Sequence, residues 1–240
     1  FNKNILIQAG EGDDDIRLYN AARIKSSTVQ GGLGIDTLYL STLTGTLTDD
    51  DLVNVSEMEF ISTWYDTSYK VSVGANALAA GITNVQLMGG NDSLDASAFT
   101  GAISLLGGAG DDTFVAATGD RLETCSLVGG AGTDELQFSV DAIATTTWNW
   151  LPGGFKGIEA IRFQHGNNIF AFDELGISTI YGGDGYDTFA ALITGANPVT
   201  TGVDFIMDAA KFIIFVGVSP DPKSAAISGG LGSDTLTVHN

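Results

Sequence analysis

Short segments in which apolar and polar residues alternate recur along the whole chain, bounded by glycine, asparagine and aspartate. Alternation with a period of two is typical of a β-strand that turns one face to the core. The clearest such segments are TLYL at 37–40, VQL at 85–87, ISLL at 103–106, SLV at 126–128 and TIY at 179–181. The pattern predicts an all-β protein built from many short strands.

A nine-residue pattern, G-G-x-G-x-D-x-U-x with U a large apolar residue, repeats between these segments. Near-complete copies begin at Ala9, Gly31, Gly107, Gly129, Gly182 and Gly229, and a shortened copy begins at Gly89. Glycine permits the positive φ angles of a tight turn, and aspartate is favoured in turns. Each copy therefore predicts a turn followed by a short strand, with U facing the core.

The spacing of the motifs predicts how the strands stack. Asp14 and Asp36 are 22 residues apart, Asp92 and Asp112 are 20 apart, and Asp112 and Asp134 are 22 apart. The longer gaps fit two or more coils from which a motif is missing. We therefore expect a parallel β-helix or β-roll solenoid with coils of about 22 residues, every coil passing the same edge. The segments VSEMEF at 55–60 and FKGIEAIRF at 155–163 resemble each other, and we interpret both as coil edges without the motif.

We expect one solenoid over residues 1–240, with 139–175 as the candidate joint between a first segment, 1–138, and a second, 176–240. The joint is rich in aromatic residues, which either fill the core of longer coils or form contacts with other subunits. Because the chain starts without methionine or a signal peptide, we expect it to be part of a longer protein.

Charge and cysteine content exclude several classes of protein. The net charge is −19, with 29 acidic and 10 basic residues, which argues against nucleic acid or an anionic membrane as the main partner. A single cysteine excludes an internal disulfide framework. The longest apolar run, FIIFVGV at 212–218, is too short to span a bilayer, so we expect no membrane insertion.

The motif suits Ca²⁺, a hard cation that takes six to eight oxygen ligands. Glycine-rich turns expose main-chain carbonyls, and the sixth-position aspartate adds a carboxylate. Stacked carboxylates would repel each other without a cation. Each aspartate has an alternative role as an ordinary turn-stabilising residue. The candidate metal ligands are Asp14, Asp36, Asp92, Asp112, Asp134, Asp187 and Asp234, with Asp13 and Asp111 beside them.

These nonapeptides resemble those of the RTX (repeats-in-toxin) family. The resemblance implies a Ca²⁺-binding parallel β-roll or β-helix, bacterial export through a one-step (type I) secretion channel, and folding outside the cell. It also implies that the first glycines open turns whose carbonyls contribute to metal binding; these are Gly31, Gly107, Gly129, Gly182 and Gly229. The repeats are dispersed, which is more similar to bacterial surface-layer (S-layer) proteins and giant adhesins than to the tandem repeats of toxins and proteases.

The sequence contains neither an H-E-x-x-H nor a G-x-S-x-G motif, and we expect no enzymatic activity. We expect a calcium-stabilised structural protein of an extracellular bacterial assembly, either an S-layer lattice or a surface filament. It would self-associate at the cell surface and could contact surface polysaccharide. The alternatives are an accessory domain of a secreted enzyme or toxin, and a module of a large adhesin.

Overall fold

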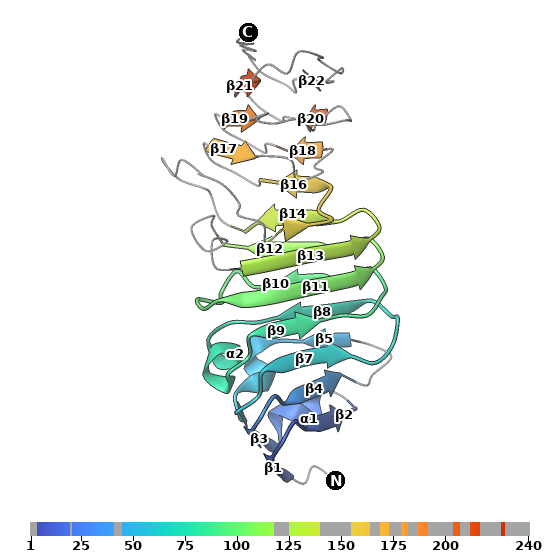
Figure 1. The fold of residues 1–240 in the computed structure, drawn as a ribbon, viewed down its shortest axis with the longest axis vertical. Coiled ribbons are helices and arrows are strands. Elements are labelled where there is room, and N and C mark those ends of the chain that lie inside the picture. Colours follow the sequence, from blue (N-terminus) through green and yellow to red (C-terminus); the bar gives the residue numbers. More distant parts are fainter. Residues whose placement is uncertain are drawn as a thin grey trace.

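The computed structural model describes residues 4–19, 21–40, 45–117, 125–139, 155–163, 169–172, 179–181, 187–191, 204–206, 212–216 and 227–228. Every strand pair among them is parallel, and the strands stack into an elongated solenoid that runs from residues 6–11 at one end to residues 227–228 at the other (Figure 1). The predicted class, an all-β parallel solenoid, is confirmed. Within the described residues no helix is long and apolar enough to cross a membrane.

Four stacks of strands form the walls of the solenoid. The first stack consists of β1 (Leu6–Glu11), β3 (Thr28–Leu33) and β6 (Val55–Ser56). The second consists of β2 (Asp15–Leu18), β4 (Thr37–Leu40), β7 (Phe60–Thr63), β9 (Asn84–Gln86), β11 (Ile103–Ala109), β13 (Cys125–Ala131) and β15 (Phe155–Lys156).

The third stack is the longest. It consists of β5 (Gly45–Leu47), β8 (Tyr69–Ser72), β10 (Ser93–Asp95), β12 (Thr113–Ala116), β14 (Glu135–Phe138), β16 (Ala160–Arg162), β18 (Thr179–Tyr181), β20 (Asp204–Ile206) and β22 (Ile227–Ser228). The fourth consists of β17 (Ile169–Phe172), β19 (Asp187–Ala191) and β21 (Phe212–Val216). The five segments expected to be strands all lie in β-strands, with ends shifted by a few residues.

The apolar residue at the eighth motif position builds the core, as predicted. In the third stack the aligned residues are Leu47, Val71, Leu94, Phe114, Leu136, Ile161, Ile180, Phe205 and Ile227. The side chains of Leu94, Phe114 and Leu136 are buried. Shifting the strand pairing by one residue would move each of these side chains to the solvent face. This row of apolar residues therefore fixes the register of the stack.

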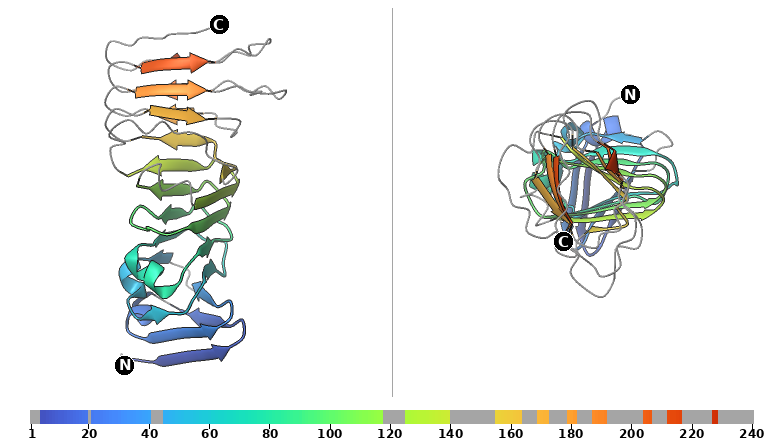
Figure 2. Two further views of the ribbon diagram at one scale, coloured as in Figure 1. Left: turned by 60° about the vertical axis from the view of Figure 1, so that its left-hand side comes forward. Right: turned by 90° about the horizontal axis from the view of Figure 1, so that it is seen from above.

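Three short helical segments, which the sequence analysis did not predict, occupy the early coils: α1 (Ala21–Lys25), η1 (Asp49–Leu52) and α2 (Ala75–Ala80). The Asp49 carboxylate accepts hydrogen bonds from the main-chain N–H groups of Gly74, Asn76 and Ala77, at 2.7, 3.0 and 2.9 Å. It thereby satisfies the free N–H groups at the start of α2 from the neighbouring coil. Figure 2 shows that the helices of the described part of the chain lie in the N-terminal half of the solenoid.

The third stack continues without interruption across residues 139–175, because β16 pairs with β14 on one side and with β18 on the other. Phe155 and Phe163 are buried there, and the Phe163 ring stacks on Phe138 with centroids 4.9 Å apart. These two aromatics fill the core; Trp148 and Trp150 lie outside the described residues. The division into 1–138 and 176–240 stays a prediction.

The expectation that every motif lies on the same edge is wrong. The turns of residues 9–14 and 31–36 connect the first stack to the second, whereas those of 107–112 and 129–134 connect the second stack to the third. The motif at 182–187 lies between β18 and β19, and thus between the third stack and the fourth. A sequence period gives the length of a coil but not the corner at which the turn lies, so this shift was not visible in the spacing.

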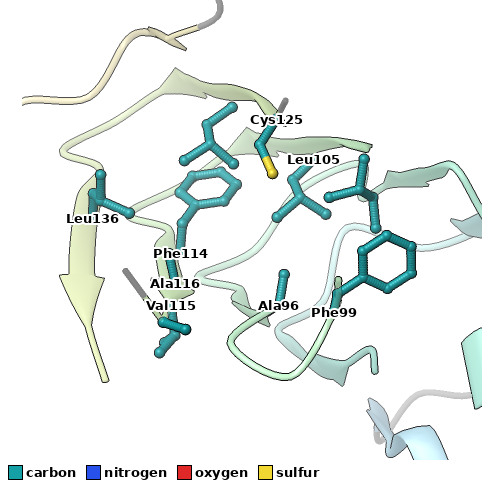
Figure 3. A pocket seen from close by; sticks show the side chains of 11 residues that line it. Ala96, Phe99, Leu105, Phe114, Val115, Ala116, Cys125 and Leu136 are labelled. Atoms are coloured by element: carbon teal, nitrogen blue, oxygen red, sulfur yellow. The ribbon is translucent and has the colours of Figure 1, made fainter. Parts of the chain in front are cut away.

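A small apolar cavity of about 20 Å³ lies in the core between the second and third stacks (Figure 3). Phe99, Phe114, Leu136 and Cys125 are among the residues that line it. A space of this size can hold about one water molecule, but the apolar lining offers it few hydrogen-bond partners. The cavity is therefore a packing defect, and Cys125 serves as an apolar residue at its wall.

The role of the eighth position can be tested with two leucines of one motif. Leu38 is fully buried, whereas Leu33 is 71% exposed. Leu38→Ala is expected to lower the free energy of unfolding by about 2–5 kcal/mol, because it leaves a cavity in the core. Leu33→Ala is expected to change it by less than about 0.5 kcal/mol. Chemical denaturation of both variants measures the difference, and equal effects would contradict the inward orientation of Leu38.

Candidate metal centre

The motif turns are tight because their glycines face the coil that precedes them. Gly32 and Gly34 have φ angles of 121° and 139°, and a Cβ on either would collide with the main-chain oxygen of Gly10 or Gly12. Any residue with a side chain would be strained at these positions and would push the coils apart. The turns thus bring main-chain carbonyls of successive coils into close contact.

The sixth-position carboxylates form two columns, one on each of the first two edges. The first column contains Asp14, Asp36 and Glu59; the second contains Asp92, Asp112, Asp134 and Glu159. In both columns a carboxylate oxygen accepts a hydrogen bond from the main-chain N–H of the sixth-position residue one coil earlier. The pairs are Asp14 N to Asp36 Oδ1, Asp36 N to Glu59 Oε2, Asp92 N to Asp112 Oδ1, Asp112 N to Asp134 Oδ1 and Asp134 N to Glu159 Oε2, each at 2.8 Å.

At the turn between two stacks, the strand ladder offers no main-chain acceptor to the N–H of the sixth-position residue. A carboxylate of the following coil takes that role. The carbonyl of Asp112 accepts from Glu135 N at 2.8 Å, so the next coil satisfies the carbonyl of this residue through the main chain. The N–H of Asp112 instead donates to the Asp134 carboxylate, at 2.8 Å. An aspartate at this position therefore prevents a buried N–H from losing its partner in the preceding coil.

The second carboxylate oxygen is buried without a hydrogen-bond partner in every motif aspartate whose side chain the structure describes. This holds for the Oδ2 atoms of Asp14, Asp36, Asp92, Asp112 and Asp134. In the complete copies, Oδ2 lies against the first glycine of its own motif: a Cβ on Gly31, Gly107 or Gly129 would collide with it. Such unsatisfied carboxylate oxygens are costly unless a proton or a cation occupies them.

The fifth-position residues bind in the opposite direction along the axis. Asp13 Oδ1 accepts from Ile35 N and Asp111 Oδ1 accepts from Thr133 N, both at 2.8 Å. These predicted residues thus clamp their turn to the following coil. Both side chains are exposed, unlike those of the sixth position.

The sequence analysis missed Glu59, Glu159 and Tyr69 as members of the columns. Tyr69 N donates to Asp92 Oδ1 at 2.6 Å and begins the second column. The glutamates belong to the two motif-free edges, VSEMEF and FKGIEAIRF, as the structure confirms. The sequence does contain a signal for the two glutamates. Each segment keeps the last part of the motif, which is an acid, one spacer residue and an apolar residue.

Burial weakens the acids of the second column. Loss of solvent raises the pKa of Asp92 from 3.8 to about 7, the Tyr69 N–H opposes this rise, and the nearby charge of Asp112 adds to it. The pKa of Asp134 is raised to about 6, chiefly by burial, and that of Asp112 is raised for the same reason. At neutral pH the ionised form of each of these buried acids is therefore destabilised by its surroundings.

The donor set fits a hard divalent cation in its chemistry. The described residues contain no group of three His, Cys, Asp or Glu side chains close enough to hold a metal. An ion on these edges would therefore take one or two carboxylates and complete its shell with turn carbonyls and water, which Ca²⁺ accepts. The unpaired Oδ2 atoms are the free side-chain ligands that such a site requires.

Four predicted ligands are not placed by the structure. Gly182, Gly229 and Asp234 lie outside the described residues, and for Asp187 only the main chain at the start of β19 is described. Comparison of the chain with protein-family models, with curated proteins and with solved structures finds no match. The likeness to RTX proteins thus stays a prediction from the motif.

The raised pKa values predict how stability changes with pH in the absence of metal. An unfolded aspartate titrates near 3.9, so between about pH 4 and pH 7 the folded chain binds more protons than the unfolded one. The free energy of unfolding therefore falls as the pH rises through this range. Thermal unfolding in metal-free buffer should give a higher Tm at pH 5 than at pH 8, by about 2–4 °C for each kcal/mol regained.

Two asparagine variants serve as controls for this experiment. Asp92→Asn should flatten the pH profile, because the amide oxygen still accepts from Tyr69 N but no longer titrates. Asp15→Asn should leave the profile unchanged, because that side chain is 55% exposed and pairs with Arg17 at 3.5 Å. A Tm that stays constant from pH 5 to pH 8 in the unmodified chain would refute the assignment.

Proposed function

We propose that this chain is a calcium-stabilised structural β-solenoid that builds an extracellular bacterial assembly, either an S-layer lattice or a surface filament. The observation that carries the proposal is the pair of stacked carboxylate columns. Asp36, Asp92, Asp112 and Asp134 are at most 2% exposed, and each keeps one oxygen without a hydrogen-bond partner.

Calcium supplies positive charge at these edges and lowers the repulsion between stacked carboxylates. The columns are an unfavourable arrangement without it, because burial and neighbouring charge both raise the pKa of Asp92. A site that exists only in the folded chain converts binding free energy into folding free energy. The net charge of −19 fits a protein in which bound cations balance part of the negative charge.

A structural role is supported by the shape and surface of the solenoid. Its stacks are continuous and elongated, which suits a building block (Figure 2). Large apolar side chains are exposed beside the turn edges: Leu33 and Ile35 on the first edge, and Trp64, Tyr65 and Met88 at the start of the second. Exposed apolar groups that gather in this way favour protein contacts.

A location outside the cell fits the kind of calcium site that we propose. Extracellular calcium modules bind in the range of about 10⁻⁴–10⁻³ M, which suits shells completed by carbonyls and water rather than by many carboxylates. Export through a type I secretion channel would keep the chain unfolded until it meets millimolar Ca²⁺. This part of the proposal rests on the resemblance of the motifs to RTX repeats.

Circular dichroism with size-exclusion chromatography, in EGTA and then in ~5 mM Ca²⁺, tests the proposal. We expect a gain of β structure with Ca²⁺ and, at the same step, large assemblies that electron microscopy shows as sheets or filaments. A compact monomer in Ca²⁺ would favour the accessory-domain alternative instead. Identical spectra in both buffers, with no bound Ca²⁺, would refute the proposal.

Asp112→Asn tests the role of one carboxylate in the middle of the second column. The amide oxygen still accepts from Asp92 N, so the metal-free variant should fold as well as the unmodified chain. Its stabilisation by ~5 mM Ca²⁺ should fall by about 1–2 kcal/mol, the binding energy of one site with a Kd of about 10⁻⁴–10⁻³ M.

Asp15→Asn is the matched control, because Asp15 belongs to a motif but points to solvent. Denaturant unfolding with and without Ca²⁺ measures the stabilisation in each variant. If both variants keep the full effect of Ca²⁺, the column carboxylates are turn-stabilising residues and not ligands.

A further inference from the structure

The two motif-free edges share one geometry, although they are 100 residues apart in the chain. In both, a short turn takes the place of the motif in the strand register. The three residues Glu57–Met58–Glu59 after β6 correspond to the six residues Gly31–Asp36. The three residues Gly157–Ile158–Glu159 after β15 correspond in the same way to Gly129–Asp134. The first residue of each turn has a left-handed backbone, with φ of 52° for Glu57 and 60° for Gly157. A non-glycine residue is strained in this conformation. Because Glu57 adopts it nevertheless, the left-handed backbone is required by the geometry of the turn.

Each short turn places a main-chain oxygen beside a buried carboxylate of the preceding coil. A Cβ on Gly31 would collide with both Glu57 O and Asp36 Oδ2. A Cβ on Gly129 would likewise collide with both Gly157 O and Asp134 Oδ2.

The motif turn at Gly107 differs from these two, because there the nearest atoms all belong to the Asp112 side chain. The convergence of a carbonyl and a carboxylate oxygen on one point is thus a property of the edges that end in a short turn.

The buried carboxylates at these two places lack the partner that would make them stable. Asp36 and Asp134 are 0% exposed, and neither Oδ2 atom has a hydrogen-bond partner. Glu59 and Glu159 reach the same residues from the other coil, each through an Oε2 atom 2.8 Å from the main-chain N of Asp36 or Asp134. Each short turn therefore sets its glutamate carboxylate against the main-chain N–H of an aspartate whose own Oδ2 lies beside the turn carbonyl.

We propose that each short turn completes a divalent-cation site of a type distinct from the motif, in which glutamate takes the place of the second aspartate. The first site uses Asp36 Oδ2, Glu57 O and the Glu59 carboxylate. The second uses Asp134 Oδ2, Gly157 O and the Glu159 carboxylate. This inference rests on the proposed function, because the same hard cation, Ca²⁺, would occupy both sites and complete its shell with water.

The length of the glutamate side chain explains its use here. The short turn has three residues where the motif has six, so its acid starts from a different point on the coil. One additional methylene lets the carboxylate still reach the N–H of the preceding aspartate. Both columns end at these glutamates among the described residues: beyond Glu59, its carbonyl accepts from Thr83 N and Asn84 N at 3.0 and 3.1 Å.

Counting bound Ca²⁺ by equilibrium dialysis and titration calorimetry tests the proposal. Glu59→Gln and Glu159→Gln keep an amide oxygen that accepts the aspartate N–H, so both variants should fold. Each is expected to bind one Ca²⁺ fewer than the unmodified chain, and the double variant two fewer. Because the two sites are separate, either variant alone suffices as a test if the other folds poorly.

Glu135→Gln is the matched control, since Glu135 pairs with Arg162 at 2.8 Å away from the column and should keep the full count. An unchanged count in both glutamate variants would overturn the inference while leaving the proposed function intact. Absence of Ca²⁺ binding in the unmodified chain would overturn both.

Discussion

The hydrogen bond from a corner N–H to a carboxylate of the next coil is the interaction on which this solenoid depends. A parallel stack satisfies its main chain along the strands, but at a tight corner the N–H of the sixth residue turns away from the ladder. Asp36, Asp112 and Asp134 supply the missing acceptor from the coil above, each at 2.8 Å. The cost is a line of buried carboxylates, and burial raises the pKa of Asp92 for this reason.

The glycines follow from the same constraint. A carboxylate can reach the preceding coil only if the turns touch, and they touch only if no side chain stands between them. Gly31 leaves room for Asp36 Oδ2, and Gly32 leaves room for the carbonyl of Gly10. The motif is therefore one unit: the glycines permit the contact, the aspartate satisfies it, and the apolar eighth residue anchors the strand that follows.

Much of this was accessible from the sequence. The spacing of Asp14 and Asp36 gave the coil length, and the apolar residues Leu38 and Phe114 identified the buried face, because both signals are local and repeat. The shift of the motif between edges was not accessible, since it depends on how many residues fill the other sides of each coil. Nor was the capping of α2 by Asp49, which brings together residues 25 apart in sequence on two different coils.

Glu59 and Glu159 lie between these cases. Their segments, VSEMEF and FKGIEAIRF, resemble each other in sequence. Only the three-dimensional register places the two acids in the columns. A three-residue deletion removes the glycine signature while it preserves the position of the acid. Sequence patterns therefore locate complete turns more readily than shortened ones.

Because the motif turns lie on different edges along the chain, different sides of the rod are acidic at different heights along its axis. Its acidic corner faces one way near β2 and β4, and another way near β12 and β14. A neighbouring rod that lies along one side meets the acidic corner over only part of its length. In the assembly proposed above, side-by-side packing of such rods would therefore be sensitive to their axial offset.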